Sequence, residues 1–94
     1  RIPLNARASE VSYEVHLTAE ARAAAEAREA LIEELEKAAY PVSDVTSTTQ
    51  NGLVELVAKL VSTAVNPEEL DQVVGRLALH HGVTHVAWES TTQD

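Results

Sequence analysis

The chain has 94 residues, a net charge of −8 and no cysteine, which is enough for one domain with a modest core. The negative charge argues against nucleic acid as a partner, because a nucleic acid backbone requires a surface of Lys and Arg. The lack of cysteine excludes disulfides and thiolate metal sites. No apolar run approaches the ~20 residues of a membrane-spanning helix, so we expect the chain itself to be soluble.

The beginning of the chain is typical of a linker. Residues 1–10 contain two Arg and a Pro and show neither the period of a helix nor that of a strand. The chain also contains no Met, not even at position 1, and we therefore expect it to be a piece of a longer protein. We place a linker at 1–10, a folded domain at 11–90 and a short tail at 91–94.

A first strand followed by a helix is predicted after this linker. The apolar residues Val11, Tyr13, Val15 and Leu17 alternate with polar ones, as in a strand with one buried face. Thr18 is the expected helix cap, and the helix should run to about Ala39. Its apolar stripe consists of Ala24, Ala27, Leu31, Leu35 and Ala38. Tyr40 precedes a proline and should end the helix.

A hairpin of two unequal strands comes next. Asn51-Gly52 between two extended runs is a strong signal for a type I′ turn, since both residues accept a positive φ. The run before the turn is rich in Ser and Thr, whereas the run after it is nearly all apolar. A polar strand suits the edge of a sheet, and the apolar strand needs neighbours on both sides. We therefore predict an edge strand paired with a central strand.

The last two elements are a helix and a strand. Asn66 is the expected cap of the helix, with Pro67 at its first position and Glu69 three residues after the cap. Gly82 is placed where a left-handed residue should end this helix. Thr84, Val86 and Trp88 then alternate with His85, Ala87 and Glu89 in a final strand. In this strand Trp88 is expected to anchor the core near the sheet edge.

The order of predicted elements is βαββαβ. With right-handed crossovers, this order gives a ferredoxin-like α+β sandwich, in which a four-stranded antiparallel sheet carries two helices on one face. The first and third strands should lie in the centre of the sheet, and the second and fourth at its edges.

The candidate metal ligands are His80, His81 and His85, with Glu89 further along. Imidazoles suit Zn²⁺ or Ni²⁺, but a site needs three or four converging ligands. His81 continues the apolar stripe of the second helix and should point inward, whereas His85 should lie on the sheet. The alternative is that His80 and His81 interact with the dipole at a helix C-terminus. We predict no metal site, no cofactor and no catalytic residue, since no nucleophile elbow, Gly-rich phosphate loop or HExxH motif is present.

Three segments together resemble the C-terminal domain of MgtC/SapB membrane proteins. They are NGLVELVAKL in the hairpin, NPEELDQVVGRL in the second helix and VTHVAWE in the last strand. The final V-x-x-V-x-W is the most distinctive, and the resemblance covers roughly Val11 to Glu89. It implies an ACT-like fold, on the cytoplasmic face of the bacterial inner membrane, joined to a preceding membrane domain through the linker at 1–10.

The resemblance also implies a function. MgtC-like proteins support growth at low Mg²⁺ and survival inside macrophages, and they are regarded as regulators rather than as Mg²⁺ transporters, with a link to F-type ATP synthase. Their known functional residues lie in the membrane portion, so none is assigned here. We therefore expect a regulatory or interaction domain that is not an enzyme. Its expected partners are the parent's membrane domain, a second copy in a homodimer, or a regulatory peptide or membrane protein.

The alternative is a small-molecule or cation sensor with an ACT-like ligand site. ACT domains often bind amino acids at a Gly-containing turn between the first strand and the first helix. Residues 17–20 occupy that place in this chain and contain no Gly, and close approach of a ligand to the backbone usually needs one.

Overall fold

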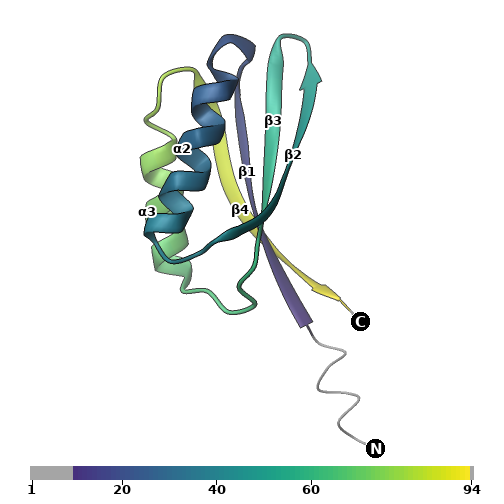
Figure 1. Ribbon diagram of the computed structural model, residues 1–94, viewed down its shortest axis with the longest axis vertical. Helices are drawn as coiled ribbons and strands as arrows, with labels where there is room; N and C mark the ends of the chain where they lie inside the picture. Colours follow the sequence, from purple (N-terminus) through teal and green to yellow (C-terminus); the bar gives the residue numbers. More distant parts are fainter. Residues whose placement is uncertain (1–9, 94) are drawn as a thin grey trace, which may run out of the picture.

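The computed structural model describes residues 10–93 and shows a sheet with two helices on one face (Figure 1). In chain order the elements are β1 (Glu10–Glu20), the 3₁₀ turn η1 (Ala21–Ala23), α2 (Ala24–Lys37), β2 (Val42–Gln50), β3 (Leu53–Leu60), α3 (Pro67–Leu77) and β4 (Val83–Gln93). The strand order is β2-β3-β1-β4, and every neighbouring pair is antiparallel. The predicted ferredoxin-like α+β sandwich is therefore confirmed.

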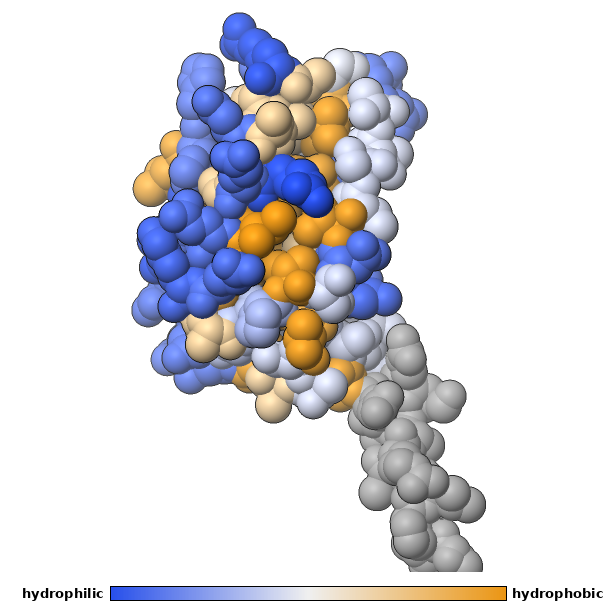
Figure 2. Space-filling view, viewed as in Figure 1, coloured by the Kyte–Doolittle hydropathy of each residue, from blue (hydrophilic) through white to orange (hydrophobic). Residues whose placement is uncertain are grey.

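The central and edge positions of the strands follow the polarity of the sequence. β1 and β3 lie in the centre, and the Ser- and Thr-rich β2 lies at one edge. Leu56 of β3 is buried beneath the helices, whereas Ser47, its partner on β2, is exposed. Figure 2 shows apolar side chains reaching the surface between the polar helices and β2, because the helices do not extend over this edge strand.

Two boundaries differ from the expected ones. The expected linker lies outside the described residues except at Glu10, which already belongs to β1. β4 continues to Gln93 through most of the expected tail. It does so because the ladder with β1 continues, with Thr91 opposite Ser12 and Thr92 opposite Val11.

The first helical turn begins later than predicted. Thr18 is not a cap, because β1 continues past it and pairs with β3 as far as Glu20. Helical structure starts with the 3₁₀ turn at Ala21, and its N-cap Glu20 makes no side-chain capping bond. The backbone N–H groups at this point bond instead to the turns that precede the two neighbouring strands. The N–H of Glu20 donates to the carbonyl of Gly82 at 2.8 Å, and the N–H of Ala21 donates to the carbonyl of Gly52 at 3.0 Å.

The end of α2 is closed by a left-handed residue. Ala39 has a φ of 70°, and the backbone N–H of Tyr40 donates to the carbonyl of Leu35 at 2.8 Å. This 6→1 bond is the Schellman pattern, which usually carries Gly at the left-handed position. The helix therefore ends at Lys37, two residues before the predicted position.

The core fills the space between the helices and the sheet. Its fully buried large side chains are Leu17, Leu31, Leu35, Leu56, Leu70, Leu77, Val15 and Val73. Of the predicted stripe on α2, Ala27, Leu31 and Leu35 are buried, while Ala24 and Ala38 are half-buried. Ala30 is also buried, so the helix packs on a wider face than predicted. Trp88 packs at the edge of this core and donates from Nε1 to Asp71 at 2.8 Å.

Tyr40 connects the end of α2 to the start of α3. Asn66 caps α3 as predicted, with its side chain accepting from the N–H of Glu68 at 2.9 Å. In a capping box the N-cap N–H would donate directly to the Glu at the third position. Here the N–H of Asn66 donates to the Tyr40 hydroxyl at 2.9 Å, and that hydroxyl donates to the Glu69 carboxylate. The buried phenol therefore relays the capping bond.

Replacing Tyr40 by phenylalanine is expected to lower the free energy of unfolding by about 1–2 kcal/mol, because two hydrogen bonds of the relay are lost. The hydrogen bond to Glu69 raises the pKa of Tyr40. A raised pKa means that this stabilisation is complete below about pH 10, the value for an unfolded tyrosine, and is lost as pH rises through the folded pKa. Urea unfolding of the wild type and of Tyr40→Phe, at several pH values from neutral to alkaline, measures the difference in the free energy of unfolding. Tyr13→Phe, which removes a phenol hydroxyl outside this relay, is the control.

An ion pair joins the outer surfaces of the two helices. Arg76 of α3 donates from Nε to Glu34 of α2 at 2.8 Å, and this hydrogen bond lowers the pKa of the Glu34 carboxyl. Glu34 is mostly covered, but the Arg76 side chain is half exposed, so water screens the pair.

We expect a coupling energy of about 0.2–1 kcal/mol between Glu34 and Arg76 at neutral pH. Because the pKa of Glu34 is depressed on folding, the coupling should be complete above the unfolded pKa and lost as pH falls through the folded one. A double-mutant cycle with Glu34→Gln and Arg76→Gln, measured at neutral pH and at about pH 2, tests this. Glu33→Gln, on the exposed side of the same helix, should show no coupling with Arg76→Gln.

Candidate functional site

The face of the sheet opposite the helices carries a group of charged side chains around His16. Since Val15 and Leu17 of β1 point into the core, the alternation of a strand places Glu14 and His16 on the opposite face. In the ladder, Glu14 lies directly opposite Glu89 of β4. The centre of this uncovered face therefore combines an imidazole with carboxylates from neighbouring strands.

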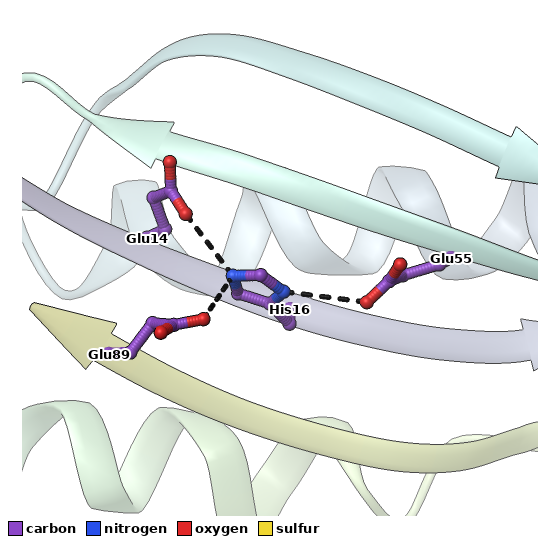
Figure 3. A network of polar contacts seen from close by, with 4 residues as sticks. All are labelled: Glu14, His16, Glu55 and Glu89. Carbon is purple, nitrogen blue, oxygen red and sulfur yellow. Dashed lines mark hydrogen bonds and ion pairs between the residues drawn. The ribbon is translucent and has the colours of Figure 1, made fainter.

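Both ring nitrogens of His16 face carboxylate oxygens (Figure 3). Its Nε2 lies 2.8 Å from Oε2 of Glu89 and 3.2 Å from Oε1 of Glu14. Its Nδ1 lies 3.4 Å from Oε2 of Glu55 on β3. Three strands thus contribute to one group, which we call the His16 cluster: Glu14, His16, Glu55 and Glu89.

The His16 cluster is open to solvent at its acidic rim. The side chain of His16 is 24 % exposed, against 31 % for Glu14, 51 % for Glu55 and 59 % for Glu89. Small ions can therefore reach the imidazole without any movement of the backbone. Glu14, His16 and Glu89 each offer a ligand atom, and these atoms lie within 4.8 Å of one another. The arrangement can hold a metal ion, which would place positive charge among the carboxylates.

A shallow hollow of about 430 Å³ lies beside the His16 cluster on the same face. It is lined by Thr18, Thr48, Gln50, Asn51, Leu53 and Glu55. The lining comes from β1 and from the β2–β3 hairpin, and Glu55 belongs to both the hollow and the cluster. Thr18 is the one lining residue from the segment 17–20, where an ACT-like ligand site was considered. The lining offers hydroxyl, amide and carboxylate groups to a small polar molecule.

The three histidines singled out from the sequence are not brought together. His80 and His81 lie in the turn after α3, His85 lies on β4, and all three are exposed. The prediction that His81 points inward is wrong, because α3 ends at Leu77 and its apolar stripe stops there. Among residues 10–93, ligand atoms converge instead at Glu14, His16 and Glu89.

The sequence carries part of the signal for the His16 cluster. Glu14 and His16 are two residues apart in a strand whose other face is apolar, so they must share the polar face. Glu55 interrupts the second face of the central β3 strand in the same way. Their convergence depends on the register of β1 against β3 and β4, which alternation alone does not give.

Comparison with known proteins gives a consistent result. The sequence profile described as the MGTC/SAPB C-terminal domain matches residues 13–88. A search of curated proteins gives no match. The solution structure of the C-terminal domain of the MgtC protein from Mycobacterium tuberculosis aligns with a TM-score of 0.76 at 19 % identity, covering 88 % of this chain and 89 % of that chain.

Two further structures share the fold. The crystal structure of the ACT domain from the GTP pyrophosphokinase of Chlorobium tepidum aligns with a TM-score of 0.63 at 11 % identity, over 86 % of this chain and 100 % of that chain. The de novo designed protein Foldit4 aligns with a TM-score of 0.59 at 20 % identity, over 90 % of this chain and 99 % of that chain. At such low identity these likenesses establish the fold alone. Within residues 10–93, neither helix has the length and apolar character required to cross a bilayer.

Proposed function

The chain belongs to the MGTC/SAPB C-terminal domain family, and we propose that it is a non-enzymatic regulatory or interaction domain of an MgtC-like bacterial inner-membrane protein. In this proposal, the residues before β1 link it to a preceding membrane domain, and it lies on the cytoplasmic face. The parent supports growth at low Mg²⁺ and survival in macrophages. The family match over residues 13–88 is the observation that carries the proposal.

The uncovered face of the sheet supports an interaction role. The helices bury one face, while the other presents the His16 cluster and the adjacent hollow, and no element within residues 10–93 covers it. A surface with negative charge and exposed hydrogen-bonding groups suits a polar or basic protein surface. The proposed partners are the parent's membrane domain, a second copy of this chain, or a regulatory peptide or membrane protein.

The proposal is tested by growth of a strain that lacks the parent protein. The strain receives either the full parent or a version without residues 10–93, and both are checked for equal amounts in the membrane fraction. We expect the shortened protein to reach the membrane but to fail to restore growth at limiting Mg²⁺. Full growth with the shortened protein would contradict the proposal. Sedimentation of the isolated chain over a range of concentrations tests the homodimer separately.

A small-molecule sensor is the second candidate, and the hollow beside Glu55 favours it. Binding of an amino acid in this hollow should produce saturable amide chemical-shift changes confined to its lining, for example at Thr18 and Thr48. Shifts spread over the helix surfaces, or absent at high ligand concentration, would exclude this candidate. The same titration with Mg²⁺ tests the cation form of the sensor.

A further inference from the structure

Both ring nitrogens of His16 lie close to carboxylate oxygens. A neutral imidazole carries one N–H and one lone pair. If Nδ1 donates to Glu55, the lone pair of Nε2 faces oxygens of Glu89 and Glu14 at 2.8 and 3.2 Å. A proton on Nε2 can point toward only one of these oxygens at a time, whereas a metal ion can bond to the nitrogen and both oxygens together.

The cross-strand pairing is a second, independent observation. Glu14 and Glu89 are direct partners in the β1–β4 ladder, and like charges in that position repel each other. Lys59 lies opposite Glu14 on the other side and can offset one of the two charges. A divalent cation between the carboxylates would neutralise both, since two carboxylates and a neutral imidazole carry a total charge of −2.

From this geometry we propose that Glu14, His16 and Glu89 bind a divalent transition-metal ion of the Zn²⁺ class through His16 Nε2 and one oxygen of each carboxylate. Zn²⁺ bonds of about 2.0–2.2 Å place neighbouring ligand atoms of a tetrahedral site roughly 3.3–3.6 Å apart. The three atoms already lie within 4.8 Å of one another, so side-chain adjustments are sufficient. The fourth position faces solvent and is taken by water.

Glu55 completes the site as an outer carboxylate. Histidines that bind metals usually donate their second ring N–H to a carboxylate or carbonyl, which fixes the tautomer and the ring orientation. Glu55 lies 3.4 Å from Nδ1 of His16 and comes from β3. It therefore holds the ring so that Nε2 is directed at the two ligand carboxylates.

The donor set selects the class of ion. Mg²⁺ prefers an all-oxygen octahedral shell and keeps several waters, whereas imidazole nitrogen with carboxylate oxygen suits Zn²⁺, Co²⁺ and Ni²⁺. The site would therefore discriminate against Mg²⁺. Metal binding at this site goes beyond the proposed interaction function. It does not depend on that function, because the binding is measured on the isolated chain.

Calorimetric titration of the untagged chain with ZnCl₂ at about pH 7.5 tests the proposal. We expect one ion per chain, with affinity reduced at least about 10- to 100-fold in His16→Gln and about 10-fold in Glu55→Gln. His85→Gln is the matched control, since His85 is an exposed histidine of the same sheet. It should bind like the wild type, and so should His80→Gln. MgCl₂ should not compete at equal concentration.

Two readouts keep the test decisive if a variant is unstable. Circular dichroism establishes that each variant is folded, and paramagnetic broadening by Co²⁺ in the wild-type chain locates the ion without any substitution. We expect broadening centred on His16, Glu14 and Glu89. The proposal is overturned by unchanged Zn²⁺ affinity in a folded His16→Gln, by broadening centred on His80 and His81, or by a wild-type chain that binds no Zn²⁺.

Discussion

Replacing Leu56 by alanine is expected to lower the free energy of unfolding by about 2–5 kcal/mol. Leu56 is 2 % exposed and lies in β3, which has a neighbour on each side. Its partner on β1 is Leu17, which is fully buried. Because both strands are held by the ladder, the core cannot collapse into the space that alanine leaves, and the cost of the cavity adds to the lost burial.

Leu53→Ala is the matched control for Leu56→Ala. Leu53 is the same residue type in the same strand, but it lies on the uncovered face and is 38 % exposed. Its truncation should cost less than that of Leu56, because Leu53 buries less apolar surface and alanine there leaves no enclosed cavity. Urea unfolding measures the loss of free energy of unfolding in both variants. The dependence of that free energy on urea concentration should be the same in both. Equal losses in the two variants would contradict the assignment of one face of β3 to the core.

Features set by neighbouring residues in the sequence could be predicted. Asn51 and Gly52 have φ values of 56° and 79°, as the type I′ turn requires. The cap at Asn66 makes the predicted bond to the helix backbone. The burial of Leu56 and the exposure of Ser47 also follow, since a central strand must be apolar on its covered face and an edge strand need not be.

The order of the strands could be predicted, but features that depend on the register between them could not. Thr18 has the chemistry of a cap, but pairing of β1 with its two neighbours keeps it in the sheet. The charged cluster depends on a register that places Glu55 and Glu89 beside His16. The Tyr40 relay similarly joins residues that are 26 and 29 positions apart in the chain. Alternation assigns each side chain to a face, but the ladder decides which side chains meet.

Replacing Gly82 by alanine is expected to lower the free energy of unfolding by about 2–4 kcal/mol, through backbone strain and overpacking together. Gly82 has a φ of 83°, which costs an L-residue roughly 1–2 kcal/mol. It is not the cap of α3 that the sequence indicated, because α3 ends at Leu77. A Cβ at position 82 would also lie 2.4 Å from Cβ of Ala23, so η1 or the turn before β4 would have to move.

Two controls separate the strain from the clash at Gly82. Gly52 has a similar φ of 79°, but a Cβ there meets nothing within 4 Å, so Gly52→Ala should carry only the strain. In the second control, Ala23→Gly removes the opposing methyl group, and its combination with Gly82→Ala should be less destabilising than the sum of the two single changes. Thermal or urea unfolding of the four proteins gives this interaction energy. Strict additivity would mean that the backbone conformation, rather than contact between η1 and the turn before β4, explains why glycine is needed at position 82.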